Sequence, residues 1–303
     1  MGRAGAAPGV GADWGTGRWP AGWPGAALDG LILAALDEDV GSGDVTSAAV
    51  VPEGLAAHGV FLIKQAGVLA GLPVVARVFG LVDPGVVFQA SVGEGAWVSP
   101  QQAVATVAGS ARSLLQAERV ALNFLQRLSG TATLTARFVA IVAGRADVLD
   151  TRKTTPGLRW MQRYAVRVAG GRNHRFGLDD GILIKDNHIR AAGGVGPAVR
   201  RACAGGPQGL RVEVECTTLD EVDAALAAGA EIILLDNMDP PGLRAAVARI
   251  AGRARTEASG GISLSNVADV AATGVDALSI GALTHSAPAL DISLEIALGA
   301  GCP

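Results

Sequence analysis

Residues 210–237, LRVEVECTTLDEVDAALAAGAEIILLDN, decide the fold class of this chain. Two short apolar runs, Leu210–Glu215 and Glu231–Asp236, flank the segment Leu219–Ala228, whose apolar residues recur at helical spacing. Short strands that alternate with helices pair in parallel, and the helices cover the sheet they form. This stretch therefore predicts one β-α-β unit of a parallel α/β domain.

The same alternation extends from Ala146 to about Gly281. The runs expected to be strands are Ala146–Asp150, Ile182–Lys185, Leu210–Glu215, Glu231–Asp236, Arg255–Ser259 and Asp276–Gly281, and the helical segments include Gly194–Ala204, Leu219–Ala228, Pro241–Ile250 and Ser265–Thr273. An open doubly wound sheet is an alternative, but the first strand lacks a following Gly-x-Gly-x-x-Gly turn. We expect a parallel α/β barrel, and an incomplete one, because six strands are fewer than the eight of a closed barrel.

The first half of the chain has a mixed pattern, which predicts a smaller α/β domain. It contains a helical segment at Ala27–Asp39 that ends in a Gly41–Asp44 turn, β-like runs at Gly59–Lys64, Val86–Val92 and Ala103–Ala108, a helix at Ser113–Leu128 and a second helix from Ser129 to about Val142. We expect a flexible extension at 1–26, this domain at 27–130 and the barrel at 131–285. Trp14, Trp19 and Trp23 in the extension could instead dock on the body of the protein.

Composition excludes several classes of function. The net charge of −3 gives no overall attraction to nucleic acid or anionic lipid, and no apolar run reaches the roughly 20 residues that span a bilayer. Three cysteines without metal-ligand spacing suit a reducing compartment, and the start of the chain lacks the pattern of a signal peptide. We expect a cytoplasmic protein that binds neither nucleic acid nor membrane.

Polar or small residues end every predicted strand. These ends are Asp150-Thr151-Arg152-Lys153, Lys185-Asp186-Asn187-His188, Glu215, Asp236-Asn237, Ser259-Gly260-Gly261 and Ser279-Ile280-Gly281. In α/β barrels the chemistry lies at the carboxyl ends of the strands. The sequence therefore predicts one active-site mouth that all six strands supply.

The charges at this mouth predict an anionic substrate. Arg152, Lys153, Arg175 and Lys185 converge there without an equal number of acids. Only three of the 25 basic residues are Lys, and two of them, Lys153 and Lys185, belong to this set. The two glycine-containing strand ends, Ser259–Gly261 and Ser279–Gly281, let backbone N–H groups approach a phosphate.

Glu215 and Asp236 end consecutive strands and suit a Mg²⁺ ion, sugar hydroxyls or both. Glu213 has the same orientation as Glu215 but lies deeper. A general acid–base pair, as in a glycosidase, is the competing interpretation. His174 and His188 lie beside cations and could donate hydrogen bonds. A hydrolase triad of His285, Ser286 and Asp291 is rejected, because no nucleophile-elbow motif is present.

With these motifs in place, the chain resembles the quinolinate phosphoribosyltransferase family, also called nicotinate-nucleotide pyrophosphorylase (carboxylating). The matching stretches are Glu38–Thr46, Glu118–Asn123, Asp150–Gly157, Asn173–Arg175, Leu183–His188, Val212–Glu215, Leu234–Asn237 and Glu257–Ile262. The resemblance implies an N-terminal open α/β sandwich, joined by a C-terminal segment at 286–303, and an incomplete α/β barrel. It also implies conversion of quinolinate and phosphoribosyl pyrophosphate, with Mg²⁺, into nicotinate mononucleotide, pyrophosphate and CO₂.

The resemblance also assigns roles to residues. Arg119, Arg152, Arg175, Lys185, His174 and Lys153 are similar to ligands of the quinolinate carboxylates and pyrophosphate. Glu215 and Asp236 are similar to a ribose and Mg²⁺ pair, which contacts the metal directly or through water or substrate, and Ser259, Gly260, Gly261, Ser279 and Gly281 to a 5′-phosphate site. Lys153, Lys185, Glu215 and Asp236 are the expected catalytic groups. Ala169 departs from the family, which usually carries glycine there.

The family's precedent is a dimer in which the N-terminal domain covers the partner's barrel. We therefore expect a homodimer or higher homo-oligomer in which Arg119 completes the partner's site. Three other functions stay open at this point. They are a related pyrophosphorylase of molybdate-transport operons, a nicotinate-specific transferase, and a catalytically silent barrel that senses phosphorylated metabolites.

Overall fold

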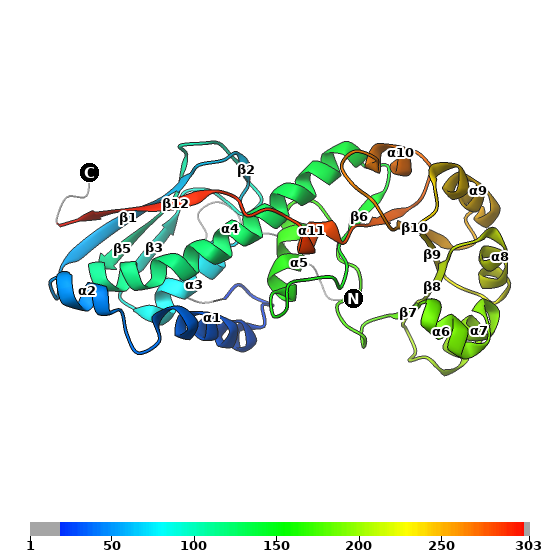
Figure 1. Cartoon of the computed structure of the whole chain (residues 1–303), viewed down its shortest axis with the longest axis horizontal. Helices are drawn as coiled ribbons and strands as arrows, with labels where there is room; N and C mark the ends of the chain where they lie inside the picture. Colours follow the sequence, from blue (N-terminus) through cyan, green and yellow to red (C-terminus); the bar gives the residue numbers. More distant parts are fainter. Residues whose placement is uncertain (1–18, 300–303) are drawn as a thin grey trace. The chain divides into compact units, whose positions relative to one another are not determined.

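The computed structural model describes residues 19–299 and divides the chain into two compact units (Figure 1). The first unit contains the chain up to Leu134, Trp160–Ala169 and the residues from Ala287 onward. The second contains Thr135–Arg159 and Gly170–Ser286. The expected barrel at 131–285 overlaps the second unit, except that residues 131–134 and Trp160–Ala169 belong to the first.

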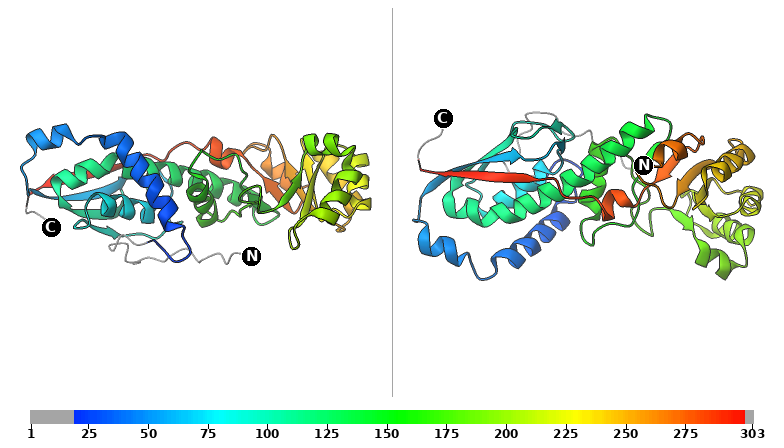
Figure 2. Two further views of the ribbon diagram at one scale, coloured as in Figure 1. Left: turned by 90° about the horizontal axis from the view of Figure 1, so that it is seen from below. Right: turned by 45° about the horizontal axis from the view of Figure 1, so that its top comes forward.

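An antiparallel sheet forms the centre of the first unit. Its strands are β1 (Ala56–Ile63), β3 (Val87–Ala90), β5 (Ala103–Ser110) and β12 (Ile292–Leu298), in the order β12-β1-β5-β3. In Figure 2 the red β12 lies along the blue β1, so a strand from late in the chain forms one edge of this sheet. The sequence pattern alone did not predict β12, whereas the resemblance implied the returning segment.

Helices cover one face of this sheet. Alternate residues of β1 are buried, and the ring of Phe61 lies 6.2 Å from that of Phe79 and 6.0 Å from that of Phe88. The helices of this unit are α1 (Gly25–Val40), α2 (Val45–Val50), α3 (Leu72–Val82), most of α4 (Ala111–Val142) and most of α5 (Arg159–Val168), and a small β2–β4 ladder joins Gly67–Val68 to Trp97–Val98. The sequence pattern did not predict α2, α3 or α5.

The prediction of two helices at 113–142 was wrong, because α4 runs without a break from Ala111 to Val142. Ser129-Gly130 resembled a helix boundary but serves a packing contact. A Cβ atom at position 130 would lie 1.9 Å from the carbonyl oxygen of Pro288, so only glycine admits this close approach of the returning chain. Ser129 Oγ accepts a hydrogen bond from the backbone N–H of Ala70 at 3.1 Å.

Residues 19–26 pack against the first unit, which agrees with the docking alternative for this part of the expected flexible extension. The ring centroid of Trp23 lies 4.4 Å from Trp160 and 4.7 Å from Tyr164. Trp19 stacks on Trp23 and donates its indole N–H to Asp29 at 2.8 Å. Trp14 lies outside the described residues.

The second unit contains a six-stranded parallel sheet, as predicted. Its strands are β6 (Asp147–Leu149), β7 (Ile182–Ile184), β8 (Val212–Cys216), β9 (Ile232–Asp236), β10 (Arg255–Ser259) and β11 (Ala277–Ser279), in the order β6-β11-β10-β9-β8-β7. No ladder joins the terminal strands β6 and β7 in the described part of the chain, so the barrel is incomplete. The helices that accompany the strands are α6 (Asp186–Ala192), α7 (Val195–Gly205), α8 (Leu219–Ala227), α9 (Pro240–Ile250), α10 (Val267–Ala271) and α11 (Ala282–His285). No helix within residues 19–299 has the length and apolar character needed to cross a membrane.

Candidate active site

The parallel register places most predicted site residues at one edge of the six-stranded sheet. Asp236 pairs with Ser259 across β9 and β10, and Ser259 pairs with Ser279 across β10 and β11. Glu215 lies on the neighbouring strand β8, and Lys185 directly follows β7. Of the predicted site residues, the second unit contains Arg152, Lys153, His174, Arg175, Lys185, Glu215, Asp236, Ser259, Gly260, Gly261, Ser279 and Gly281. Arg119 lies on α4 in the first unit.

Lys185 and Glu215 form an ion pair whose Nζ and Oε2 atoms are 3.0 Å apart. The side chain of Lys185 is 48% exposed, whereas that of Glu215 is 14% exposed. The ammonium group therefore remains accessible to a ligand while the carboxylate holds its position. His188 accepts the backbone N–H of Lys185 at Nδ1 over 2.9 Å, so it caps the start of α6.

Lys153 lies beside the end of the last strand, although it follows the first. A Cβ atom at Gly281 would lie 3.1 Å from Lys153 Cδ, so the lysine stem passes next to this glycine. The backbone carbonyl of Lys153 accepts a hydrogen bond from Thr284 Oγ1 at 2.8 Å. The loop after β6 is thus fixed against the loop after β11, which brings a cation to the predicted phosphate site.

The loop after β10 has the shape of an anion site. Gly260 and Gly261 have φ angles of +91° and +61°, a conformation that favours glycine. A Cβ at Gly260 would overlap Asn237, whose side chain donates to Asp236 at 2.6 Å. Among the described residues, the backbone N–H groups of Gly260, Gly261 and Gly281 donate to no other group of the chain. Unused amide donors of this kind bind phosphate oxygens.

Ser279 contributes to this site differently from its neighbours. It is 6% exposed, and its hydroxyl donates a short hydrogen bond to Glu257 Oε1. Since the hydroxyl proton is already used, the strand end at Ser279 offers an anion the backbone of the following residues rather than this side chain.

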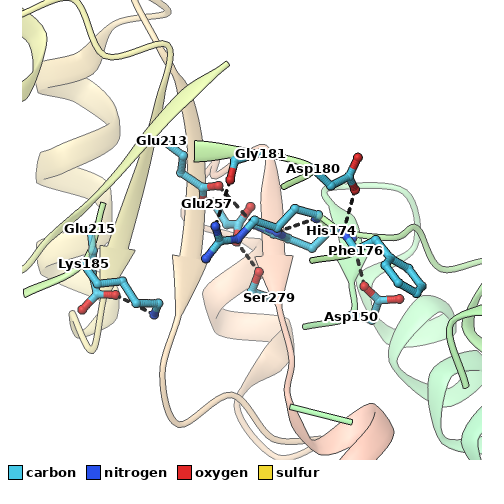
Figure 3. A network of polar contacts seen from close by, with 11 residues as sticks. Asp150, His174, Phe176, Asp180, Gly181, Lys185, Glu213, Glu215, Glu257 and Ser279 are labelled. Atoms are coloured by element: carbon cyan, nitrogen blue, oxygen red, sulfur yellow. Dashed lines mark hydrogen bonds and ion pairs between the residues drawn. The ribbon is translucent and has the colours of Figure 1, made fainter. Parts of the chain in front are cut away.

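His174 lies in a buried network of carboxylates (Figure 3). Its Nε2 atom is 3.1 Å from Glu213 Oε2 and 3.4 Å from Glu257 Oε1, and both glutamates are buried. Asp150, at the end of the first strand, accepts the backbone N–H of His174 at 2.9 Å and a short hydrogen bond from the Asn173 side chain. Two strands therefore hold the imidazole ring, and the residue after a third strand holds the backbone of His174.

Two effects compete for the protonation of His174. Burial disfavours the imidazolium, but hydrogen bonds and charge attraction from Glu213 and Glu257 raise the pKa of His174 to about 10. The neutral ring is favoured by the Arg175 backbone N–H, which donates to Nδ1 at 2.7 Å. One neutral hydrogen bond contributes about 1 kcal/mol, and bonds to charged groups about 1.5–3 kcal/mol each. The two carboxylates therefore outweigh this single neutral hydrogen bond, and their contacts raise the pKa of His174.

The environment of Arg175 indicates a site built for an anion. Burial, and then repulsion by the nearby Arg152 charge, lower the pKa of this guanidinium group from its usual value. Arg175 Nη1 donates to the carbonyl oxygen of Gly181 at 2.8 Å, which orients the side chain. Two guanidinium groups held close together are stabilised when a dicarboxylate or phosphate binds between them.

The predicted Mg²⁺ residues fit a hard cation by chemistry and position. Glu215 and Asp236 supply carboxylate oxygens from the ends of the adjacent strands β8 and β9, which are ligands that Mg²⁺ prefers. Within residues 19–299 the cluster of three potential metal ligands is a different one, His174, Glu213 and Glu257. Two carboxylates alone leave most of an octahedral shell to water and substrate oxygens, as is usual for Mg²⁺.

Sequence reasoning missed the role of Glu257 and placed Glu213 only as a deeper neighbour of Glu215. The available signal was the period-2 pattern of β10, which turns Glu257 to the same face as Ser259. Asp150 belonged to a predicted strand end but had no assigned partner. Its contacts with Asn173 and His174 join segments that are 23 and 24 residues apart in the chain.

Comparison with known proteins decides the family. The family model for the quinolinate phosphoribosyl transferase N-terminal domain matches residues 44–129, and the model for the C-terminal domain matches residues 131–295. The chain belongs to the quinolinate phosphoribosyl transferase family. The predicted fold, an incomplete parallel α/β barrel preceded by an open α/β sandwich, is confirmed with it.

Three relatives of this quinolinate phosphoribosyl transferase chain match it over 82–99% of their own length. The nicotinate-nucleotide pyrophosphorylase [carboxylating] of Mycobacterium leprae is 47% identical over 274 residues, which cover 88% of this chain and 95% of the relative. The quinolinate phosphoribosyltransferase [decarboxylating] 1b of Nicotiana tabacum is 43% identical over 288 residues, covering 89% and 82%. The crystal structure of NadC from Streptococcus pyogenes superposes with a TM-score of 0.88 at 44% identity and covers 92% of this chain and 99% of that one.

Proposed function

We propose that this protein transfers the phosphoribosyl group of phosphoribosyl pyrophosphate to quinolinate with loss of CO₂, giving nicotinate mononucleotide and pyrophosphate for NAD biosynthesis. The observation that carries the proposal is the agreement between the family match over both domains and the site at the strand ends. That site contains a cationic cluster, a pair of carboxylates and a set of unused backbone donors.

Quinolinate, a planar dicarboxylate, suits the cationic side of the mouth. Arg152 and Arg175 can each form two parallel hydrogen bonds with a carboxylate, and His174 adds a third cation. The exposed ammonium group of Lys185 completes the set in the second unit. These residues hold the pyridine ring by its carboxylates and leave its nitrogen free to react.

Phosphoribosyl pyrophosphate suits the opposite side. The backbone N–H groups of Gly260, Gly261 and Gly281 bind the 5′-phosphate, and Lys153 neutralises charge beside them. Glu215 and Asp236 accept hydrogen bonds from the ribose hydroxyls. The sugar then lies between the phosphate site and the pyridine nitrogen.

The reaction follows from this arrangement. The pyridine nitrogen forms a bond to the anomeric carbon while the bond from that carbon to the pyrophosphate oxygen breaks, and the oxygen keeps the electron pair. Lys153 and the nearby cations stabilise the negative charge that develops on the leaving group. The nitrogen becomes positive, so the ring accepts the electron pair of the C2–carboxylate bond when CO₂ leaves. A proton from solvent then binds to C2 in place of the carboxylate.

Mg²⁺ is part of this proposal. Glu215 and Asp236 would hold it, and when bound it would neutralise pyrophosphate charge.

We also propose a homodimer or higher homo-oligomer, in which Arg119 contributes to the partner's site, and a cytoplasmic location. The location is supported by the free state of Cys203 and Cys216 in the described part of the chain.

The test is product analysis with two acceptors. Purified protein, phosphoribosyl pyrophosphate and Mg²⁺ should convert quinolinate, but not nicotinate, into nicotinate mononucleotide detected by mass spectrometry. Conversion of nicotinate but not of quinolinate would support the nicotinate-specific transferase instead. Binding of both substrates without product would support the metabolite sensor.

A further inference from the structure

Glu257 is a buried carboxylate that, beyond its charge beside His174, has no role in the mechanism described above. It lies on β10, two residues before Ser259, and is 3% exposed. The core of an α/β barrel is normally filled by branched apolar side chains. A carboxylate at this depth therefore needs a physical reason.

One oxygen atom of Glu257 joins the two sides of the site (Figure 3). Oε1 accepts the short hydrogen bond from the Ser279 hydroxyl, and the same atom lies 3.4 Å from His174 Nε2. His174 belongs to the proposed quinolinate side, and Ser279 ends the strand that leads into the phosphate side. Glu257 is the shared partner of two elements that bind different substrates.

Stability does not explain this residue. Taking a carboxylate out of water is costly, and replacing a whole buried ion pair by apolar side chains of similar volume often leaves a protein equally or more stable. Glu213 already lies closer to His174, at 3.1 Å, so Glu257 is not needed merely to provide an acceptor for the ring. What Glu257 adds is the connection to Ser279.

We propose that Glu257 is a positioning residue for phosphoribosyl transfer, whose Oε1 atom holds the His174 ring and the Ser279 hydroxyl together and so fixes the pyridine subsite relative to the 5′-phosphate subsite. The inference rests on the proposed function. The pyridine nitrogen and the anomeric carbon must approach closely and in line, and a misplacement of about 1 Å can lower the rate about 100-fold. A shared acceptor beneath both subsites keeps that separation constant.

The test compares two replacements of Glu257 that differ in one property. Glu257→Gln keeps an oxygen acceptor of the same shape, whereas Glu257→Leu fills the space without an acceptor. We expect Glu257→Leu to lower kcat about 100-fold in protein that remains folded at the assay temperature, and Glu257→Gln to stay within about tenfold of wild type. Ser279→Ala should also lower kcat. In the Glu257→Leu background it should cause no further decrease, because both changes remove the same link between Ser279 and Glu257.

Thr256→Val is the matched control. Thr256 is equally buried on the same strand but bonds to Asp276, so this change should lower Tm and leave kcat near wild type. Near-wild-type kcat in Glu257→Leu would overturn the proposal, and so would a Glu257→Gln variant as slow as Glu257→Leu. If Glu257→Leu does not fold, Ser279→Ala decides alone, and a kcat near wild type in this variant would contradict the proposal. A wild-type protein without turnover would instead count against the proposed function itself.

Discussion

The ammonium group of Lys185 lies 3.0 Å from the carboxylate of Glu215, yet nearly half of the lysine side chain remains exposed. An exposed ion pair of this kind contributes about 0–1 kcal/mol to stability. The pair therefore matters little for folding, and its position at the strand ends suits substrate binding.

We predict that Lys185→Ala lowers kcat/KM for quinolinate by at least about 100-fold, because it removes a charge that orients and neutralises the dicarboxylate. The Tm should change little. Steady-state kinetics and thermal unfolding of the same preparation check this. Lys64→Ala is the control, since Lys64 pairs with Glu295 in the first unit at the same distance, 3.0 Å. Unchanged kinetics in Lys185→Ala would show that Lys185 does not bind substrate.

The glycine loop after β10 gives a second prediction. Gly260→Ala should raise KM for phosphoribosyl pyrophosphate by more than about tenfold, because a methyl group would overlap Asn237 and displace the amide donors. Gly229→Ala is the control. Gly229 has a similar φ of +88°, but its Cβ would meet nothing within 4 Å, so it carries the backbone strain without the overlap. Equal effects of both variants on KM would show that backbone strain alone is responsible.

His174 gives a prediction about pH. Its pKa in the folded protein, about 10, lies above the roughly 6.5 of an unfolded chain. Protonation of His174 therefore contributes stability that is fully present below about pH 6.5 and is lost as the pH rises through about 10. The ring signals of His174, followed by NMR, should titrate near pH 10, and Glu213→Gln should move this titration downward. A His174 pKa near 6.5 in the wild-type protein would contradict the assigned carboxylate contacts.

Arg119 gives a prediction about assembly, which depends on the proposed dimer. If Arg119 completes the partner's site, Arg119→Ala and Lys153→Ala chains that are mixed after reversible dissociation will form some dimers with one intact site. Random reassociation should then restore roughly a quarter of wild-type activity. No recovery, despite demonstrated subunit exchange, would show that Arg119 does not act across a two-fold interface.

The strand ends could be read from the sequence because they depend on local pattern. All six parallel strands formed where apolar runs predicted them, and β10 has the predicted bounds, Arg255–Ser259. The elements that were missed depend on distant contacts. β12 becomes a strand by pairing with β1, more than 200 positions earlier, and Gly130 lies inside a helix because Pro288 crosses it there.

The site residues also divide into those that local sequence pattern predicts and those that depend on distant contacts. Lys185 and Glu215 could be proposed from their places at strand ends, whereas the partnership of His174 with Glu257 could not. It joins a loop and a strand 83 positions apart in the sequence, whose atoms come within 3.4 Å only in the folded chain. Sequence periodicity indicates which face a side chain occupies, but not which residue it meets across the barrel.

The stoichiometry of the reaction tests most directly whether this protein is a decarboxylating phosphoribosyltransferase. With quinolinate labelled in its C2 carboxylate, purified protein and Mg²⁺, we expect CO₂ and pyrophosphate to be released in equal amounts, and only when phosphoribosyl pyrophosphate is present. Absence of labelled CO₂, or its release without phosphoribosyl pyrophosphate, would contradict the account.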